Sequence, residues 1–417
     1  MNSFIARPAA AAWEFLALSL TALLFFHPPL GQAEELKPMF NGTNLTGWVV
    51  RGGQATYGIE GDTITGTVAV KGGGNTFLCS EKEYGDFILE LEIKADPGLN
   101  SGVQIRSHCF DKETTYDHGN TRLKIPANRV HGYQVEVDHR PERRWSGGVY
   151  EEGRRGWLFP LGTNSPAGQA FRFGEWNTYR IVCLGDSIKT WINGVPAADL
   201  VDSETLKGFI GLQVHATEKP GLQVRFRNVR LQDLGRHEWR PLWNGKNFEG
   251  AHIIGKGDWK TEDGVIHATH AVTENEFGHL VTDQTFSDFT VRLKYKAIKG
   301  NSGLYFRVEE TGLSGVSGFQ AEIDADKDAG GLYETNGRAW VKQPAVEDVK
   351  KWFKPQNWNT MTVSAQGKRV TVNVNGHISA ELRDDPGRLE GHLALQLHGG
   401  QDCELYFKDI EILAPAE

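Results

Sequence analysis

The segment HGYQVEVDHR, residues 131–140, alternates apolar and polar residues with a period of two. In a β-strand, such alternation places the two sets on opposite faces of the sheet. The apolar set is Tyr133, Val135 and Val137, and the polar set is Gln134, Glu136 and Asp138. The polar set either meets solvent, as outer strand faces usually do, or lines a ligand-binding site. The second possibility arises because carboxyl groups can exchange protons with a bound polar ligand.

Two further segments predict polar rows with related chemistry. In SGVQIRSH, residues 101–108, the row would contain Gln104, Arg106 and His108, and in IGLQVHA, residues 210–216, Gln213 and His215. A carboxylate, a guanidinium and an imidazole together suit acid–base chemistry on a polar ligand. We therefore predict that Glu136, His215 and Arg106 are catalytic. The predicted ligand-binding residues from these rows are Gln134, Asp138, His108 and Gln213.

Aromatic and basic residues follow the glutamate strand in RRWSGGVYEEGRRGWLFP, residues 143–160. Tyr150 and Trp157 could offer flat faces to a sugar ring, and Arg154 and Arg155 could donate hydrogen bonds to it. The alternative is that the aromatic rings belong to the core, which is the commoner place for large aromatic residues. The sequence is compatible with both interpretations.

The chain contains an internal repeat. YGDFILELEIKADPGLNSGVQIR at 84–106 returns as FSDFTVRLKYKAIKGNSGLYFR at 286–307, GYQVEVD at 132–138 as GFQAEID at 318–324, and GFIGLQVHA at 208–216 as GHLALQLHG at 391–399. Each copy is long enough to fold as a domain. The second-copy equivalents of the polar rows are Arg307, Gln320, Glu322, Asp324, Gln396 and His398.

Composition and patterning predict an all-β protein. The 417 residues include 49 glycines and 12 tryptophans, and most regular segments have period two rather than a helical period. Asn-Gly pairs at 193–194 and 375–376 suit hairpin turns. We predict two tandem β-sandwich (jelly-roll) domains, residues 34–236 and 237–417. The net charge of −8, without a long basic run, argues against nucleic acid as a partner.

Residues 1–33 resemble a secretory signal peptide. Arg7 precedes the apolar run FLALSLTALLFF, and small residues in GQA at 31–33 suit cleavage. We expect export to the periplasm or the extracellular space, with an uncleaved anchor as the alternative and no other membrane segment. The four cysteines form no CxxC pair, so Cys79 and Cys109 either pair in a disulfide or are single buried thiols.

The motifs MFNGTNLTGW, NSGVQIR, GYQVEVD, SGGVYEEGRRGWL, GEWN, INGV and GLQVH resemble the 3-keto-disaccharide hydrolase domain family. They span most of residues 38–234, and the second copy matches more loosely in the same order. The resemblance implies two concanavalin A-like sandwiches, similar to lectins and glucanases, with the ligand face on the concave sheet. It also implies cleavage of glycosides that are already oxidised at C3, with a sugar 3-dehydrogenase acting upstream in the same pathway.

The implied reaction begins with removal of the acidified C2 hydrogen and ends with net hydrolysis at C1. Glu136 or His215 would be the base, the other ionisable group would protonate the leaving oxygen, and Arg106 would stabilise the enolate. Because the first copy is closer to the family pattern, we expect catalysis there. The aglycone and the preferred anomer stay open.

Two other functions are alternatives to this one. A non-catalytic tandem carbohydrate-binding protein would gain avidity from its two copies. A retaining glucanase of the laminarinase type would need a further carboxylate after Glu136 and Asp138, but Glu142 falls one residue too late and the second copy has no such glutamate nearby. Carboxylates would also suit a divalent cation such as calcium, although no EF-hand-like spacing is present.

Overall fold

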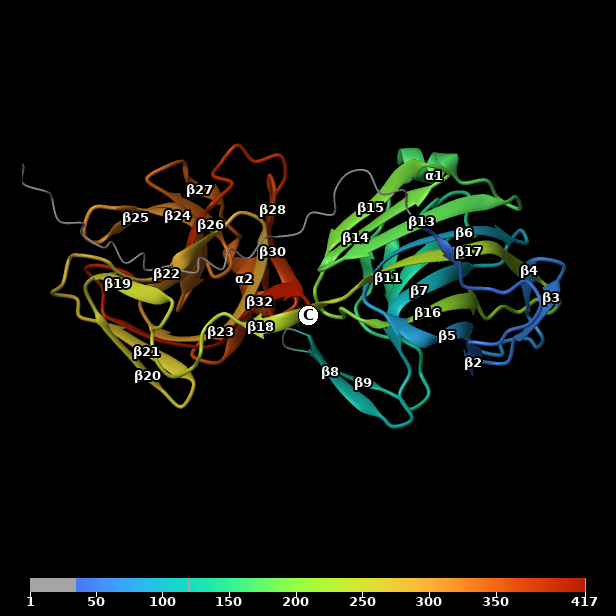
Figure 1. Ribbon diagram of the computed structural model, residues 1–417, viewed down its shortest axis with the longest axis horizontal. Helices are drawn as coiled ribbons and strands as arrows, with labels where there is room; N and C mark the ends of the chain where they lie inside the picture. Colours follow the sequence, from blue (N-terminus) through green and yellow to red (C-terminus); the bar gives the residue numbers. More distant parts are fainter. Residues whose placement is uncertain (1–34, 119–120, 417) are drawn as a thin grey trace, which may run out of the picture. The chain divides into compact units, whose positions relative to one another are not determined.

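The computed structural model describes residues 35–118 and 121–416, which form two β-sandwiches that follow one another along the chain (Figure 1). Each sandwich consists of two antiparallel sheets, so the predicted all-β tandem architecture is confirmed. The predicted signal segment, residues 1–33, lies outside the described residues. Among the described residues, no helix is long and apolar enough to cross a membrane.

The first sandwich pairs a β6 sheet with a β10 sheet. The β6 sheet contains, in spatial order, β15 (Val195–Val201), β14 (Ser187–Ile192), β13 (Asn177–Leu184), β6 (Asp86–Ala95), β17 (Gln223–Gly235), β4 (Thr63–Thr67) and β3 (Thr56–Glu60), with β1 (Lys37–Pro38) beside β17. The β10 sheet contains β12 (Gly156–Phe159), β11 (Val149–Glu152), β10 (His131–Val137), β7 (Ser101–His108), β16 (Gly208–Val214), β5 (Thr76–Tyr84) and β2 (Trp48–Gly52). The hairpin β8 (Thr114–His118) and β9 (Thr121–Ile125) and the short helix α1 (Pro166–Ala170) complete it.

The second sandwich repeats this order with a β23 sheet and a β25 sheet. The β23 sheet contains β20 (Asp258–Glu262), β21 (Val265–His270), β32 (Cys403–Pro415), β23 (Phe289–Lys299), β28 (Asn359–Gln366), β29 (Arg369–Val374) and β30 (His377–Leu382), with β18 (His237–Pro241) beside β32. The β25 sheet contains β19 (Ala251–Gly255), β22 (Gly278–Phe286), β31 (Gly391–Leu397), β24 (Asn301–Thr311), β25 (Gly315–Asp324), β26 (Leu332–Thr335) and β27 (Ala339–Lys342). Its helix is α2 (Val346–Trp352).

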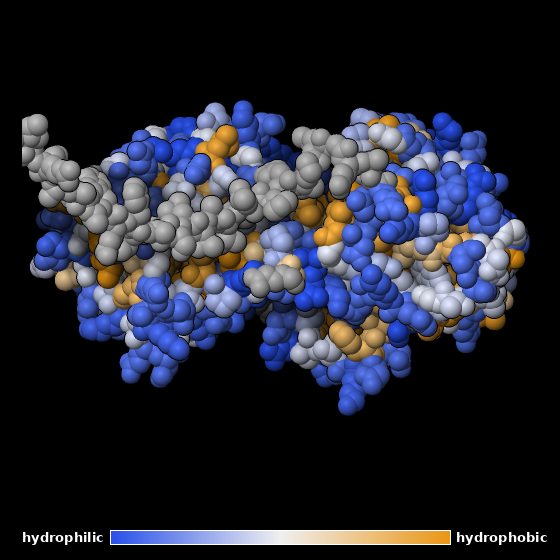
Figure 2. All heavy atoms as spheres, in the orientation of Figure 1, coloured by the Kyte–Doolittle hydropathy of each residue, from blue (hydrophilic) through white to orange (hydrophobic). Residues whose placement is uncertain are grey.

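The apolar row of β10 lies in the core of the first sandwich, as the alternation predicts. Tyr133, Val135 and Val137 are at most 1% exposed and belong to one cluster with residues of β6. The polar row on the opposite face is also buried, since Glu136 is only 4% exposed. All residues of β10 are therefore buried, on both faces of the strand. On the viewed surface of each sandwich, by contrast, hydrophilic side chains predominate (Figure 2).

A β-bulge in β7 interrupts the alternation at Arg106. Tyr133 pairs with Ile105 whereas His131 pairs with His108, so β7 carries one extra residue. Arg106 takes up this residue in the left-handed region, with φ 45°. The prediction that Arg106 shares a face with Gln104 is therefore wrong, because a bulge re-aims the side chain that it carries.

The guanidinium of Arg106 instead connects the two sheets of its sandwich. It forms an ion pair of 2.9 Å with Asp86 at the start of β6 and donates to the carbonyl oxygens of Gly85 and Gly185, both at 2.7 Å. In the second sandwich Arg307, with φ 50°, donates to the carbonyl oxygens of Ser287 and Gly367 at 2.8 Å. The same bulge and the same connection thus occur twice.

Removal of the Arg106 side chain is expected to destabilise the first sandwich by about 3–5 kcal/mol, because Asp86 loses its buried cation. Urea unfolding of Arg106→Ala measures this. Arg307→Ala is the matched control and should cost less, since Asp288 is 38% exposed and lies 3.4 Å from Arg307. A stable Arg106→Ala protein would contradict this structural role.

Candidate functional site

Glu136 and the side chains around it lie on the face of the β10 sheet that is opposite the core. The register places Glu136 opposite Gly102 on β7, and Leu212 of β16 opposite Val103, so Gln213 follows in the row of Gly102. The missing side chain at position 102 leaves space that Gln134 fills. A Cβ added to Gly102 would lie 2.6 Å from Cγ and Cδ of Gln134.

The carboxyl group of Glu136 is held by three donors. Asn100 Nδ2 lies 2.6 Å from its Oε1, Gln134 Nε2 lies 3.1 Å from its Oε2, and Arg143 Nη2 lies 3.1 Å from its Oε1. Burial raises the pKa of Glu136 to about 7, although these hydrogen bonds and the charge of Arg143 act in the opposite direction. A carboxyl group with a pKa near neutral is suited to general acid–base catalysis.

Asp138 is the partner of Arg143. It accepts from Nε and Nη2 of Arg143, both at 2.8 Å, and from the backbone N–H groups of Trp145 and Arg140. Burial alone would raise the pKa of Asp138, but these hydrogen bonds hold it below its usual value. The side chain predicted to support Glu136 therefore does so through Arg143, which contacts both carboxylates.

The two predicted histidines differ in placement. The Nδ1–H of His215 donates to the carbonyl oxygen of Ala216 at 2.6 Å, because a carbonyl can only accept, so the lone pair of Nε2 is left for a ligand. His108 pairs with His131 at the other end of β10 and stacks on Phe110 at 5.5 Å. Burial lowers the pKa of His108. The bulge at Arg106 thus separates His108 from the row of Glu136.

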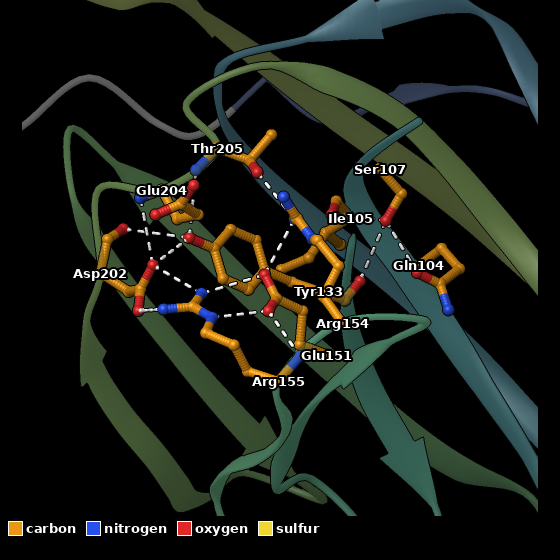
Figure 3. Close-up of polar contacts among 10 residues, drawn as sticks. All are labelled: Gln104, Ile105, Ser107, Tyr133, Glu151, Arg154, Arg155, Asp202, Glu204 and Thr205. Carbon is orange, nitrogen blue, oxygen red and sulfur yellow. Dashed lines mark hydrogen bonds and ion pairs between the residues drawn. The ribbon is translucent and has the colours of Figure 1, made fainter. Parts of the chain in front are cut away.

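Arg154 and Arg155 are buried among acidic partners (Figure 3). Each side chain is 5% exposed, and each forms an ion pair with Glu151. Arg155 also pairs with Asp202 at 2.8 Å, and Arg154 donates to Thr205 Oγ1 at 2.8 Å. This placement differs from the prediction that they donate to a sugar, because Glu151 and Asp202 are buried carboxylates that require cations.

Tyr150 and Trp157 lie beside the glutamate row. Tyr150 is opposite Gln134 and meets Trp157 edge to face at 5.3 Å. The guanidinium of Arg143 lies over Trp157 at 5.2 Å and over Trp145 at 4.8 Å. Both predicted aromatic residues are thus near Glu136, and Arg143 contacts the ring of Trp157.

In the second sandwich the corresponding face contains a pocket of about 580 Å³. Asn301 Nδ2 hydrogen-bonds Oε1 of Glu322, and burial raises the pKa of Glu322 to about 8. His398 repeats the arrangement of His215, since its Nδ1 lies 2.7 Å from the carbonyl oxygen of Gly399. The residues that line the pocket are Phe277, His279, Asn301, Tyr305, Gly315, Val316, Gln320, Glu322, Tyr333, Thr335, Asn336, Trp340, Gln396 and His398.

In the second copy, Gln320 and Gln396 are connected by hydrogen bonds between side-chain amides, whereas the first copy has the ion pairs of Arg143. Gln320 Nε2 lies 3.3 Å from Gln396 Oε1, and Gln396 Nε2 donates to Tyr305 Oη at 2.9 Å. Asp324 accepts from the backbone N–H groups of Asp326 and Lys327 at 2.7 and 3.1 Å. Asp324 thus hydrogen-bonds backbone N–H groups where Asp138 binds Arg143.

Three site residues were not predicted. Asn100 and Asn301 hold the two glutamates, and the Asn-Ser-Gly triplet repeated at 100–102 and 301–303 is the signal that could have identified them. Arg143 has no such signal, since it lies in a segment that differs between the copies. Within residues 35–118 and 121–416, no group of three or more His, Cys, Asp or Glu is arranged to hold a metal ion, and the four cysteines are free thiols.

The chain belongs to the family described as 3-keto-alpha-glucoside-1,2-lyase-like domain, whose model matches residues 35–232 and again residues 238–413. The two matches correspond to the two sandwiches, so both are copies of this domain. A comparison with curated proteins gives no match.

Solved structures resemble single copies. A candidate glycosyl hydrolase from Parabacteroides distasonis ATCC 8503 is 22% identical over 42% of this chain and 92% of its own, with a TM-score of 0.32. A carbohydrate-binding module, CBM66, from Bacillus subtilis is 20% identical over 46% and 98%, with a TM-score of 0.30. A galectin-like protein of unknown function from Bacillus subtilis is 11% identical over 48% and 94%, with a TM-score of 0.35.

Replacement of Glu322 by glutamine is expected to raise the free energy of unfolding relative to wild type, and this gain should grow as pH rises. Because its pKa is raised from 4.5 to about 8, Glu322 keeps a proton that the unfolded chain releases, so the folded state loses stability across this window. Glu322→Gln removes that loss and should gain on the order of 1–3 kcal/mol at pH 8 and almost nothing at pH 4.

Urea unfolding at pH 4, 6 and 8 measures this effect. Glu136→Gln is the matched control and should gain less, because it also takes the charged partner away from Arg143. An unchanged or lower stability of Glu322→Gln at pH 8 would contradict the buried, raised-pKa carboxyl group.

Proposed function

We propose that the protein cleaves 3-keto-glycosides by removing the C2 proton, eliminating the C1 substituent and hydrating the product. The observation that carries the proposal is a buried glutamate on the face opposite the core, with its pKa raised to about 7 in Glu136 and about 8 in Glu322. In both copies an asparagine holds this glutamate, and a histidine whose Nδ1 binds a backbone carbonyl oxygen directly follows the strand two places away in the same sheet. Membership of the 3-keto-alpha-glucoside-1,2-lyase-like family supports it.

The chemistry needs a base of moderate strength. The C3 ketone acidifies the hydrogen on C2, the glutamate carboxylate takes that proton, and the C–H electron pair forms an enolate. Collapse of the enolate expels the oxygen on C1, which gives the free aglycone and a C1=C2 enone. Addition of water, with OH to C1 and H to C2, completes a net hydrolysis.

The amide groups take the role that the sequence suggested for Arg106. Arg106 and Arg307 are bound to backbone carbonyls and carboxylates near the other sheet. The amides of Gln134 in the first copy and Gln396 in the second are neutral donors on the glutamate face, each with one acceptor among the described residues, and they suit the enolate oxygen. The departing C1 oxygen needs a proton, which Nε2 of His215 or His398 can deliver after taking one up, since Nδ1 already binds a backbone carbonyl oxygen.

The substrate class implies a preceding reaction. A glycoside with a ketone at C3 arises by two-electron oxidation of its C3 alcohol, which is the work of a sugar 3-dehydrogenase. Such an enzyme in the same pathway, and export of this chain, remain predictions.

Release of p-nitrophenol from p-nitrophenyl 3-keto-β-glucoside tests the function. Wild type is expected to release it, and the Glu136→Gln/Glu322→Gln double variant should be slower by about 10²–10⁴-fold while still binding the substrate. The unoxidised glucoside is the control and should not react. Absence of release by wild type that demonstrably binds the 3-keto-glucoside would refute the proposal.

A non-catalytic sugar-binding function is the second candidate, and the open aromatic pocket of the second sandwich favours it. In that case the protein would bind the unoxidised glucoside as tightly as the 3-keto form. Substitution of either glutamate by glutamine would then leave binding nearly unchanged.

A further inference from the structure

The two copies differ most in the segment that follows the glutamate strand. Val135 pairs with Val149 in the first copy and Ala321 pairs with Leu332 in the second, so these positions correspond. Between the aspartate and the next strand, the first copy has residues 139–148 and the second has residues 325–331, which is three residues fewer. This difference in length decides which side chains reach the site.

The longer segment of the first sandwich places the guanidinium of Arg143 over the ring of Trp157. Its Arg143 is bound to Asp138 by two hydrogen bonds of 2.8 Å and to Glu136 by one of 3.1 Å. From this position the guanidinium lies 5.2 Å from the ring centre of Trp157. A sugar ring stacked on this face of Trp157 would have to displace a side chain held by two buried carboxylates.

The shorter segment leaves the equivalent tryptophan open. Trp340 pairs with Tyr333 as Trp157 pairs with Tyr150, so the two tryptophans occupy the same position in the sheet. Trp340 is 36% exposed and lines the 580 Å³ pocket together with Glu322. An exposed indole face beside polar pocket-lining side chains is the arrangement that stacks on pyranose rings.

The polar lining of this pocket is suited to an uncharged ligand. No arginine or lysine is among its lining residues, and Tyr305 and Thr335 replace Gln104 and Glu152 of the first copy. Neutral amide and hydroxyl groups recognise sugar hydroxyls without the desolvation of a full charge.

His279 supplies a second, independent indication of a ligand. It lines the pocket, is 2% exposed, and neither ring nitrogen makes a hydrogen bond of normal geometry within the described residues, although the backbone of Ser314 lies near. Burial lowers its pKa to about 4, so at neutral pH the ring offers one donor and one acceptor. A buried polar group in this state is unsatisfied until a ligand or water meets it. The amide of Gln213 in the first sandwich is likewise unpaired within the described residues, so this observation indicates a ligand at the second pocket, and the difference between the copies rests on Arg143 and Trp340.

We propose that the pocket of the second sandwich, and not the corresponding face of the first, takes the pyranose ring of an uncharged glycoside, stacked on Trp340. In the first sandwich Arg143 occupies the place of that ring. The identity of the glycoside as a 3-keto-glycoside rests on the proposed function. Turnover is then assigned to Glu322, in place of the first copy that the sequence favoured.

Titration calorimetry of the full chain with methyl 3-keto-β-glucoside tests the proposal. The Glu136→Gln/Glu322→Gln background is used so that the ligand is not consumed. We expect one site per chain, a loss of about tenfold or more in affinity for Trp340→Ala, and a change of less than about twofold for the matched Trp157→Ala. Two sites, a loss in Trp157→Ala alone, or no binding at all would overturn the proposal.

A loop exchange tests the cause of the difference. Replacement of residues 139–148 by the sequence of residues 325–331 is expected to raise the stoichiometry from one site to two, because it removes Arg143 and Trp145. If the exchanged protein folds, as circular dichroism would show, and still binds one ligand, occlusion by Arg143 is wrong. If it does not fold, the tryptophan pair still decides the location of the site.

Turnover of the single glutamate variants separates this proposal from the proposed function. Loss of p-nitrophenol release in Glu322→Gln but not in Glu136→Gln supports both. Loss in Glu136→Gln alone would overturn the assignment while leaving the function intact. Ligand binding that depends on Trp340, with no release by wild type, would refute the function and leave the pocket assignment standing.

Discussion

The buried guanidinium that joins the two sheets of each sandwich is the constraint on which the rest of the structure depends. Arg106 bonds to Asp86, to the carbonyl oxygen of Gly85 between β5 and β6, and to that of Gly185 in the β13–β14 turn of the opposite sheet. Arg307 repeats the connection to backbone carbonyls. A charge at this depth is tolerated only when its donors are paired. The bulge that aims the guanidinium inward also ends the regular alternation of β7, so the site is confined to the residues that precede it.

On the other face of the same sheet, a buried carboxyl group also needs hydrogen-bonding partners. Glu136 and Glu322 are buried, and their hydrogen bonds come mainly from amides, which satisfy a carboxyl group without fully compensating its charge. This balance leaves both pKa values near neutral. Arg143 adds a cation in the first copy only, and its charge acts to lower the pKa of Glu136.

Much of the fold follows from sequence, because apolar alternation and a long internal repeat are strong signals. The core row of Tyr133, Val135 and Val137 and the separation of Glu136 from it were predicted from the period of two alone. Arg106 was misplaced because one inserted residue reverses the facing of a side chain, and nothing in SGVQIRSH marks the insertion. The remaining differences arise from contacts between distant segments. Arg155 was expected at a sugar, yet its carboxylate partner Asp202 lies 47 residues away.

The glycine opposite each glutamate has a consequence for how such sites can diverge. Gly102 and Gly303 leave the space in which Gln134 and Gln320 lie, since a methyl group added at either glycine would come within 2.6 and 2.5 Å of the respective glutamine. Even alanine at either position would push the glutamine aside and change the donors around the carboxyl group. Between the two copies of this chain, both glycines are kept while the segments 139–148 and 325–331 differ, so ligand preference can change there and the space for the glutamine is retained.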